Sequence, residues 1–437
     1  MKRIIVLSLI VVSVLLIAIV PTFAAEKRFD GVTLKVFANS HDPMLKAVKW
    51  SVPVVKEKFG IDILMDEAPY GTQFDKAMSA FVAHTGQYDV IVGAHQWTGA
   101  WADGGYVIPL DDFIKNDPEF DPSIYVEKAY QINSEWKGKQ YALPFNMEGR
   151  LMFYRKDIFE KEGFKVPTNR EEWLSIVQSI NNNPEYKEKG IWGAVYMYAT
   201  EQGISYPFET YFQMFDWNSI KTENGFWDEN FQICIDKPKM VEAFQYWQDR
   251  LKDMPPGVES YNLPEAYQFY IDGKAAMTEV WPLTLYGMLL DPANADLRAK
   301  TGTADIAIGY PMSGGWGIFI CADSKIQEAA WEYIKFMTTA ENDLFFFKEF
   351  GKGPSAKATY TDDSLKETYG DWLKGQSEAI SKAVSYGKIA TMSELYGGNF
   401  AVITNQIMTG KLPAEEGVDK LIEELKGILE RAGYPQK

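Results

Sequence analysis

Segments with the apolar pattern of a β-strand alternate with segments that have the apolar pattern of an α-helix along the first part of the chain. Strand-like runs, in which apolar residues alternate or stand together, occur at residues 32–38, 61–67 and 88–93. Segments with an apolar face at helical spacing lie between them, at residues 42–60 and 70–84. This β-α-β-α-β order predicts a largely parallel sheet covered by helices. Ligands of such sheets bind outside the carboxyl ends of the strands, so we expect ligand contacts in the loops that begin at Asn39 and Gly93.

The same two patterns continue through the rest of the chain. Strands are predicted on both sides of Pro144 and at residues 275–281, 304–312 and 314–324. Helices are predicted at residues 166–180, 240–251, 262–273, 325–350 and 413–432. Asp272 and Gly273 end one of these helices, and the short strand that follows leads to Trp281. Residues 191–236 are aromatic but weakly periodic, so no element is predicted there in detail.

Length and the N-terminal segment bound the architecture and the location. A chain of 437 residues is too long for one hydrophobic core and predicts two lobes. Lys2 and Arg3 precede an apolar run over residues 4–20, and small residues follow it. This pattern predicts a secretory signal peptide over residues 1–24 and a periplasmic or extracellular protein. An uncleaved membrane anchor is the alternative, because the apolar run has nearly the length that spans a bilayer.

Charge and cysteine content exclude some classes of partner. The formal net charge is −16, which argues against nucleic acid and against an anionic membrane surface, since both require clustered Lys and Arg. The simpler account of this charge is solubility of an exported protein. The two cysteines, Cys234 and Cys321, lie in apolar runs that resemble strands. We expect two buried thiols there in preference to a disulfide.

Sequence patterns of several enzyme classes are missing from the chain. It contains no Gly-rich phosphate loop followed by Lys, no serine elbow and no helix with two zinc-binding His residues. The three His residues, His41, His84 and His95, are not spaced as a metal cluster, so no metal and no cofactor are expected. Glycoside hydrolysis requires only a pair of carboxylates, and the chain has 60 Asp and Glu. A secreted glycosidase therefore stays open as an alternative.

Aromatic residues indicate a class of ligand. The chain has 13 Trp, and the indole combines a flat apolar face with one N–H donor, which suits the C–H faces and hydroxyl rim of a sugar. Most of these Trp residues are expected in the core, as on the apolar helix faces of Trp173, Trp247 and Trp331. Three others follow strands or a Gly pair: Trp97, Trp281 and Trp316. A lid over the local core would explain each one alone, but their similar positions together favour ligand contact.

The ordered motifs resemble the extracellular solute-binding proteins of ABC importers, in the carbohydrate-binding group that includes maltose-binding protein. The resemblance extends from about Leu34 to Leu429. Its markers, in order, are YDVIVG and WADGGYVIPLDDFI; WKGKQYALPFN and MFYRKDIFEKEGFKVPTNREEW; YIDGKAAMTEVWP; PMSGGWGIFICADSKIQEAAWEYIKFM; and GKGPS. One such motif is weak evidence, whereas the ordered set is specific.

The resemblance implies an α/β protein with two lobes, hinge strands and a cleft between the lobes. The first lobe would comprise residues 30–143 and 312–355, and the second lobe residues 144–311 and 356–437. Crossings are expected near Leu143–Asn146, near Met312–Trp316 and after Ser355. The implied function is high-affinity capture of a carbohydrate, a disaccharide or oligosaccharide, by a monomer, followed by hinge closure and delivery to the permease subunits of an ABC transporter, without catalysis.

Matching motif positions imply a set of ligand contacts. These are His41, Asp42, His95, Gln96, Trp97, Asn146, Glu148, Glu279, Trp281, Gly315, Trp316, Tyr396 and Asn399. Asn146 and Glu148 alternate along one extended segment, and Glu279 and Trp281 along another, so each pair is expected on one side. Trp281 is the main expected stacking residue.

Structural roles compete with ligand contact at several of these positions. Asp42 is equally suited to cap the following helix, His95 to a structural hydrogen bond, and Glu148 to a buried salt bridge. Tyr396 and Asn399 lie in a segment that matches the family poorly. Gln96 and Trp97 stand where the maltose-binding pattern has a charged pair, so the sugar is left open. A peptide, polyamine or phosphorylated polyol is the alternative ligand, although no Arg or Lys neighbours the three loop Trp residues in the sequence.

Overall fold

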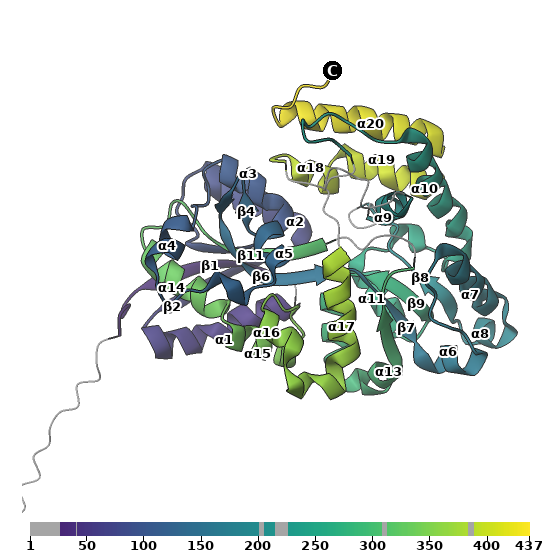
Figure 1. Cartoon of the computed structure of the whole chain (residues 1–437), viewed down its shortest axis with the longest axis horizontal. Coiled ribbons are helices and arrows are strands. Elements are labelled where there is room, and N and C mark those ends of the chain that lie inside the picture. The colour runs from purple at the N-terminus through teal and green to yellow at the C-terminus, as the bar shows by residue number, and fades with distance from the viewer. Residues whose placement is uncertain (1–26, 41, 201–204, 215–225, 308–312, 383–388) are drawn as a thin grey trace, which may run out of the picture.

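A computed structural model gives the fold of the chain (Figure 1). It describes residues 27–40, 42–200, 205–214, 226–307, 313–382 and 389–437. The predicted signal peptide, residues 1–24, lies outside the described residues. Within the described ranges, no helix combines the length and the apolar character needed to cross a membrane.

The first sheet has five strands in the order β2-β1-β3-β11-β6. They are β1 (Thr33–Asn39), β2 (Asp62–Ala68), β3 (Val90–Ala94), β6 (Ala142–Gly149) and β11 (Ser313–Ile320). As the pattern predicts, β1 pairs in parallel with β2 and β3. The late strand β11 inserts antiparallel between β3 and β6. The N-terminal sheet is therefore completed by a strand that begins more than 200 residues after β3 ends.

The second sheet has four strands in the order β10-β7-β9-β8. They are β7 (Leu151–Arg155), β8 (Trp192–Val195), β9 (Ala275–Val280) and β10 (Thr301–Ala304). Only Arg150 separates β6 from β7, so the chain passes from one sheet to the other within one residue. Figure 1 shows β6 extending from the first sheet toward the second. A separate short hairpin pairs β4 (Glu135–Trp136) with β5 (Lys139–Gln140).

Helices cover both sheets, as Figure 1 shows. Those at the first sheet are α1 (Asp42–Phe59), α2 (Tyr70–Val82), α3 (Thr98–Asp103), α4 (Asp111–Asn116), α5 (Glu127–Ile132), α14 (Gln327–Met337), α15 (Ala340–Phe350) and α16 (Lys357–Thr361). The others are α6 (Lys156–Glu162), α7 (Arg170–Asn182), α8 (Pro184–Glu188), α9 (Ser205–Gln213), α10 (Lys237–Arg250), α11 (Leu263–Ile271), α12 (Pro282–Leu290), α13 (Ala295–Lys300), α17 (Lys366–Lys382), α18 (Met392–Gly397), α19 (Asn399–Met408) and α20 (Ala414–Arg431).

Local sequence explains where these helices begin and end. Asn169 caps α7, because its side chain accepts a hydrogen bond from the Glu172 N–H at 2.9 Å. The helix α11 ends at Ile271 with Asp272 as its C-cap, and Gly273 follows with a φ of +72°, a left-handed conformation that Gly adopts without strain. The sequence therefore predicted both helices correctly.

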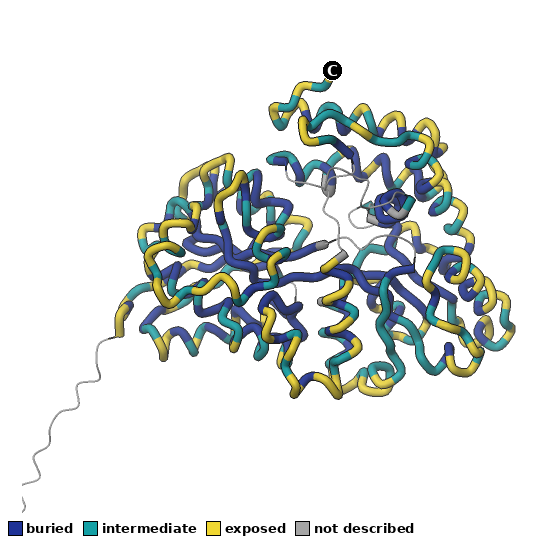
Figure 2. Tube along the Cα trace, viewed as in Figure 1, coloured by how far each residue is buried: buried dark blue, intermediate teal, exposed yellow. Residues whose placement is uncertain are grey.

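Two large apolar cores lie on the two sheets. The first contains side chains of β1, β3, α1, α14 and β11, and the second contains side chains of β7, β9, α7, α10 and α20. Figure 2 shows buried chain concentrated on the strands of each sheet. Two cores match the expectation from chain length, because one core would leave too much apolar surface exposed.

Two local predictions are wrong. Residues 304–312 were expected to form a strand, but β10 ends at Ala304, residues 305–307 are not in a strand, and 308–312 lie outside the described residues. Cys234 was expected to be buried but is exposed, while Cys321 is buried and both are free thiols. The cause at Cys234 is that the predicted strand does not form, since Ile233 makes just an isolated bridge to Trp227.

Candidate functional site

A cavity of 620 Å³ opens between elements of the two sheets. The first-sheet wall consists of Asn39, Ser40, Pro69, Tyr70, Gly71, Ala94, His95, Gln96, Glu148, Gly314, Gly315 and Trp316. The second-sheet wall consists of Asn262, Leu263, Pro264, Tyr267, Gln268, Trp281, Thr284 and Met288. The first wall gathers the carboxyl ends of the parallel strands β1, β2 and β3, which is where an open α/β sheet binds ligands.

Aromatic rings of the first-sheet wall support one another. The ring centroids of Tyr70 and Trp316 lie 6.0 Å apart in an edge-to-face arrangement. Behind them, Trp97 is 5.5 Å from Tyr70 and 5.7 Å from Trp316. The Gln96 amide donates a hydrogen bond to the Tyr70 hydroxyl. Because the rings restrain each other, this wall presents a fixed aromatic surface to the cavity.

Amide side chains tie the strand ends of this wall together. The Asn39 Nδ2 donates to the Gln73 Oε1 at 2.7 Å, and the Gln73 Nε2 donates to the Val92 carbonyl at 2.7 Å. Gln73 is buried, so these bonds form away from solvent, where an unsatisfied amide would be costly. The α2 helix that carries Tyr70 is thereby linked to the ends of β1 and β3.

A β-bulge places Trp316 at the cavity. Trp316 of β11 pairs with Asn146, while the next residue, Gly317, pairs with Pro144, so Phe145 is an extra residue on β6. Such a bulge bends the strand locally and changes the direction of neighbouring side chains. A Cβ on Gly315 would lie within 2.5 Å of the Asn133 side-chain carbon Cγ, so this position accepts only Gly without a shift.

Trp281 stands at the junction of β9 and α12 on the second-sheet wall. Pro282 begins α12 and fits the first helical turn, where no N–H donor is required. The Tyr267 hydroxyl donates to the Trp281 carbonyl at 2.9 Å. A Cβ on Gly314 would lie 2.7 Å from the Trp281 ring, so the indole rests against the backbone of β11. Trp281 therefore contacts a strand of the opposite sheet.

Buried polar groups surround the start of this junction. Arg150 is fully buried, and its Nη1 donates to the Glu209 Oε2 at 2.9 Å. Its Nη2 donates to the backbone carbonyl of Glu279 at 2.7 Å, and the Tyr206 hydroxyl donates to the same carbonyl at 2.8 Å. Burial raises the pKa of the Glu279 carboxyl to about 7, against the opposing effects of the Ala307 N–H and of the Arg150 charge.

Six of the expected contact residues line the cavity. They are His95, Gln96, Glu148, Trp281, Gly315 and Trp316. His41 lies outside the described residues, and Asp42 and Tyr396 belong to α1 and α18 but their side chains lie outside the description.

Four expected contact residues do not line the cavity. Trp97 is 4% exposed because it fills the first core behind the wall rings. Asn146 is fully buried and its Nδ2 donates to the Glu148 Oε1 at 3.4 Å, so it lies beneath Glu148. The Glu279 carboxylate is directed into the protein, where its Oε1 accepts a hydrogen bond from the Ala307 N–H at 2.9 Å. Asn399 is exposed and donates to the Glu424 carboxylate at 2.9 Å.

Several lining residues were missed by the sequence reasoning. Tyr70 follows the second parallel strand, and the strand-end rule that selected the Asn39 and Gly93 loops would have found it as well. Tyr267 and Met288 lie on helices that have ordinary apolar periodicity, so no sequence signal distinguishes them from core residues.

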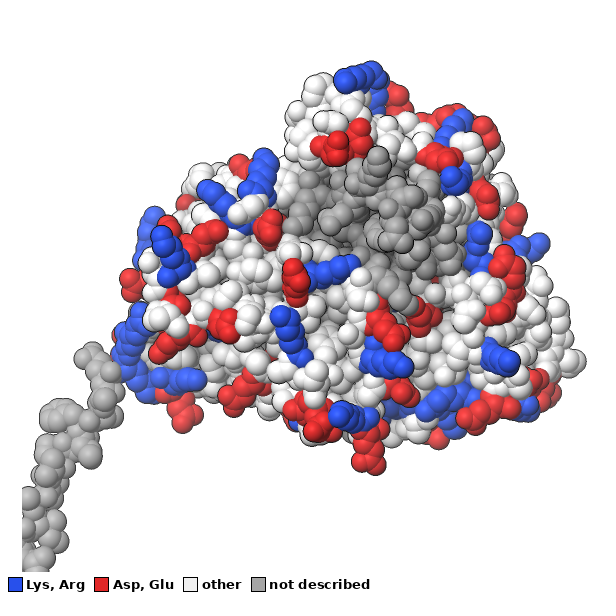
Figure 3. All heavy atoms as spheres, viewed as in Figure 1, with Lys and Arg blue, Asp and Glu red and all other residues white. Residues whose placement is uncertain are grey.

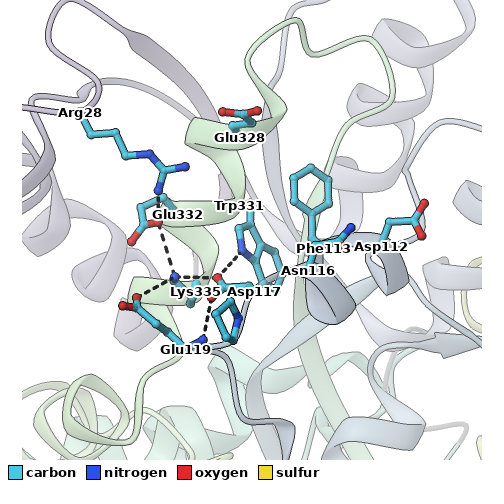
Figure 4. A pocket seen from close by; sticks show the side chains of 11 residues that line it. Arg28, Asp112, Phe113, Asn116, Asp117, Glu119, Glu328, Trp331, Glu332 and Lys335 are labelled. Carbon is cyan, nitrogen blue, oxygen red and sulfur yellow. Dashed lines mark hydrogen bonds and ion pairs between the residues drawn. The ribbon is translucent and has the colours of Figure 1, made fainter.

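A second recess of 610 Å³ lies apart from this cavity, between α4 and α14. Several of its charged groups bind one another, as Figure 4 shows. Asp117 accepts hydrogen bonds from the Lys335 Nζ at 2.7 Å and from the Trp331 Nε1 at 2.9 Å, and Arg28 pairs with Glu332 at 3.3 Å. All of its lining residues belong to the first-sheet side of the molecule. We therefore take the cavity between the sheets as the candidate site.

Within the described ranges, no group of three or more His, Cys, Asp or Glu side chains is arranged to hold a metal ion. On the face shown in Figure 3, Lys and Arg side chains are interspersed with Asp and Glu. That face carries no basic patch of the kind that binds nucleic acid.

Comparison with known proteins gives the family. The family model described as bacterial extracellular solute-binding protein matches residues 45–343, well over half of the chain. This chain belongs to that family. The maltotriose-binding protein of Pyrococcus abyssi is 23% identical over 351 residues, which cover 77% of this chain and 69% of the relative.

Solved structures of this kind share the fold. The maltose-bound MalE3 of T. maritima superposes with a TM-score of 0.80 at 22% identity, covering 91% of this chain and 100% of that chain. A solute-binding protein of Agrobacterium radiobacter in complex with ribitol also superposes with a TM-score of 0.80, at 24% identity, covering 92% of this chain and 100% of that chain. The two-lobed solute-binding architecture expected from the motifs is thereby confirmed.

Proposed function

We propose that this solute-binding protein captures a neutral carbohydrate in the cavity between the two sheets and delivers it to an ABC importer. The observation that carries the proposal is the pairing of aromatic rings on opposite walls. Tyr70 and Trp316 line one wall, and Tyr267 and Trp281 line the other. A sugar offers a C–H surface to each side, so two facing aromatic walls match its shape and polarity.

The charges of the lining favour a neutral ligand. Among the described lining residues there is no Lys or Arg, and Glu148 is the one Asp or Glu. A phosphorylated polyol would require cationic donors, so the phosphate alternative lacks support in this part of the site. Arg150, which the sequence did not place near Trp281, lies 5.9 Å from that ring, but its charge already pairs with Glu209.

Polar lining groups complement the rings. Gln96, Asn262, Gln268 and Thr284 supply amide and hydroxyl groups around the cavity, and Glu148 supplies a carboxylate. A sugar hydroxyl both donates and accepts hydrogen bonds. These side chains therefore offer donors and acceptors to the hydroxyl groups around the edge of a sugar ring. The volume of 620 Å³ lies in the range of small-molecule sites and suits a di- or trisaccharide. The relatives named for maltotriose and maltose, and the ribitol complex, support a neutral polyhydroxyl ligand.

The predicted lobes give the mechanism of capture. With residues 30–143 and 312–355 in one lobe and residues 144–311 and 356–437 in the other, the second-sheet wall belongs to one lobe and the first-sheet wall, apart from Glu148, to the other. A ligand that contacts both walls stabilises the state in which the lobes meet, because these contacts exist together only there. The closed monomer is the form presented to the permease, and no step of the cycle breaks a covalent bond of the sugar.

Calorimetric titration of the mature chain tests the proposal. We expect binding of at least one of maltose, maltotriose and ribitol, with a dissociation constant near micromolar, equivalent to about 8 kcal/mol. Ligand at a hundred times that constant should stabilise the fold by about 2.7 kcal/mol. Absence of heat and of a thermal shift for every sugar and polyol in a broad panel would refute the proposal. Turnover of an aryl glycoside, abolished by one carboxylate substitution, would instead favour a glycosidase.

A further inference from the structure

The buried Arg150 occupies an unusual position between the two sheets. It is the single residue between β6 and β7, and its side chain is 0% exposed. A buried guanidinium is unfavourable unless it is paired and hydrogen-bonded. Glu209 of α9 supplies the opposite charge at 2.9 Å and is itself 2% exposed. The ion pair with Glu209 therefore holds the Arg150 side chain in one position where the chain passes between the sheets.

From this position Arg150 reaches the segment that carries Trp281. Its second amino group donates to the Glu279 carbonyl, two residues before Trp281, at 2.7 Å. The guanidinium also lies 3.8 Å from the centroid of the Tyr206 ring and 5.9 Å from that of the Trp281 ring, both within the range of cation–π attraction. The rigid fork of Arg thus binds Glu209 and the Glu279 carbonyl together, which the single ammonium group of Lys cannot reproduce with the same geometry.

Other contacts leave the Trp281 indole with a restricted orientation. Tyr206 adds a second donor to the Glu279 carbonyl, and Tyr267 holds the Trp281 carbonyl. The indole itself lies against Gly314 of β11. Without Arg150, the Glu279 carbonyl would lose its charged donor and the ring its cationic neighbour.

We propose that Arg150 is a positioning residue, which fixes the Glu279–Trp281 segment so that the indole of Trp281 faces the ligand cavity. The expected effect of Arg150 on sugar affinity rests on the proposed function. Its expected effect on the orientation of the indole does not. Arg150 does not line the cavity and acts through Trp281.

The first test measures the indole without any ligand. Acrylamide quenching of Trp281 is taken as the difference between each protein and its Trp281→Phe derivative. In Arg150→Met we expect the quenching constant of Trp281 to rise at least twofold, and in Arg150→Lys to rise by a smaller factor. Arg155→Met is the matched control, because Arg155 also pairs with a carboxylate, Asp157 at 2.6 Å, but on the far end of β7. It should leave the quenching unchanged.

The second test is a double-mutant cycle on the dissociation constant for maltotriose. Arg150→Met should weaken binding about tenfold when Trp281 is present and less than twofold in the Trp281→Phe background. Equal losses in both backgrounds, or unchanged quenching in the folded Arg150→Met protein, would overturn the inference.

Two milder variants test the same inference if Arg150→Met does not fold. Tyr206→Phe keeps the ring beneath the guanidinium and removes one donor to the Glu279 carbonyl, and Glu209→Gln removes the charge that fixes Arg150. Both variants should raise the quenching constant of Trp281. An unchanged constant in both variants would overturn the inference. If the unmodified protein binds no sugar, the proposed function fails, while the quenching result still decides the role of Arg150.

Discussion

Trp281 illustrates how a single residue obtains its role from local chemistry. A strand ends at Val280, Pro282 begins the next helix, and the residue between them can join neither element. Its backbone is extended, with φ of −64° and ψ of 121°, and its indole is half-buried at the cavity. An indole held partly open to solvent retains apolar surface that a sugar can still cover.

Replacement of this indole should weaken sugar binding. For Trp281→Ala we expect a dissociation constant for maltotriose about 30-fold higher, equivalent to about 2 kcal/mol, because a central aromatic contact is lost. Trp192→Ala is the matched control, since Trp192 is also half-buried on the second sheet but does not line the cavity. Its dissociation constant, measured by calorimetry, should stay within about twofold of the original. Similar losses in both variants would contradict the role of Trp281.

Glu279 should make the stability of the fold depend on pH. Its carboxyl has a pKa of about 7 in the folded protein, raised from 4.5 by burial. Between these values the unfolded chain has released the proton and the folded chain retains it, so the free energy of unfolding falls as pH rises. The contribution is fully present below pH 4.5 and lost above pH 7. The loss amounts to about 3 kcal/mol.

Urea denaturation of the original protein and of Glu279→Gln checks this sign. Glu279→Gln has no proton to release at this position, so its stability relative to the original should increase by about 3 kcal/mol between about pH 4 and pH 8. Other carboxyl groups titrate equally in both proteins and cancel in the comparison. A stability difference that does not vary with pH would show that the carboxyl ionises normally.

At the scale of elements, β11 connects the two walls of the cavity. The bulge of β6 opposite it places Trp316 on the first-sheet wall, and two residues earlier Gly314 of β11 gives room to the Trp281 ring. One strand therefore sets the position of an indole from each wall. A side chain at position 314 would push the second indole while leaving the strand pairing with β6 intact.

Gly314→Ala should therefore lower affinity more than stability. The added Cβ would lie 2.7 Å from the Trp281 ring, so the ring must move, and we expect binding of maltotriose to weaken about tenfold, or about 1.4 kcal/mol. Gly370→Ala in α17 is the matched control, because no atom lies within 4 Å of its Cβ position. That change should leave affinity unaltered and stabilise the helix by about 1 kcal/mol. Calorimetry and urea denaturation measure the two effects, and unaltered affinity in Gly314→Ala would contradict the expectation.

At the scale of the whole molecule, a buried ion pair joins residues 343–359 to the distant strand β6 beside the passage between the sheets. The Lys352 Nζ donates to the Asp343 Oδ1 at 2.9 Å and to the carbonyl of Phe145, on β6, at 2.6 Å. Asp343 also accepts hydrogen bonds from Ser355 and Thr359. This network holds the segment after α15 against β6, just before the chain enters the second sheet.

Loss of Lys352 should destabilise the whole fold. In Lys352→Met the Asp343 charge stays buried without its partner, which costs about 3–5 kcal/mol. Lys56→Met is the matched control, because Lys56 pairs with Asp62 at 2.6 Å but both side chains are half exposed. It should cost less than about 1 kcal/mol. Urea denaturation compares the two, and equal losses would mean that the buried pair contributes no more than a surface pair.

Prediction from sequence succeeded where the determining forces are local. The strands that end at Asn39 and Ala94, the helix that ends before Asp272 and Gly273, and the strand that leads to Trp281 all follow from periodicity and from residues that stop or start elements. It failed at Cys234, where an apolar run has no partner strand to pair with. It also failed at Glu279, because simple alternation does not extend past the end of β9 to Trp281.

The amino-acid sequence alone determined the order of the elements, the class of fold and the strand ends that line the cavity, because turn residues and hydrophobic periods act over a few neighbours. Tertiary structure alone decided which aromatic residues reach the cavity. Trp97 follows a strand and Trp316 follows a Gly pair, and both belong to the first core, yet Trp316 lines the cavity and Trp97 does not. That choice depends on a bulge between β6 and β11, whose partners lie about 170 residues apart, and no local pattern encodes such a register.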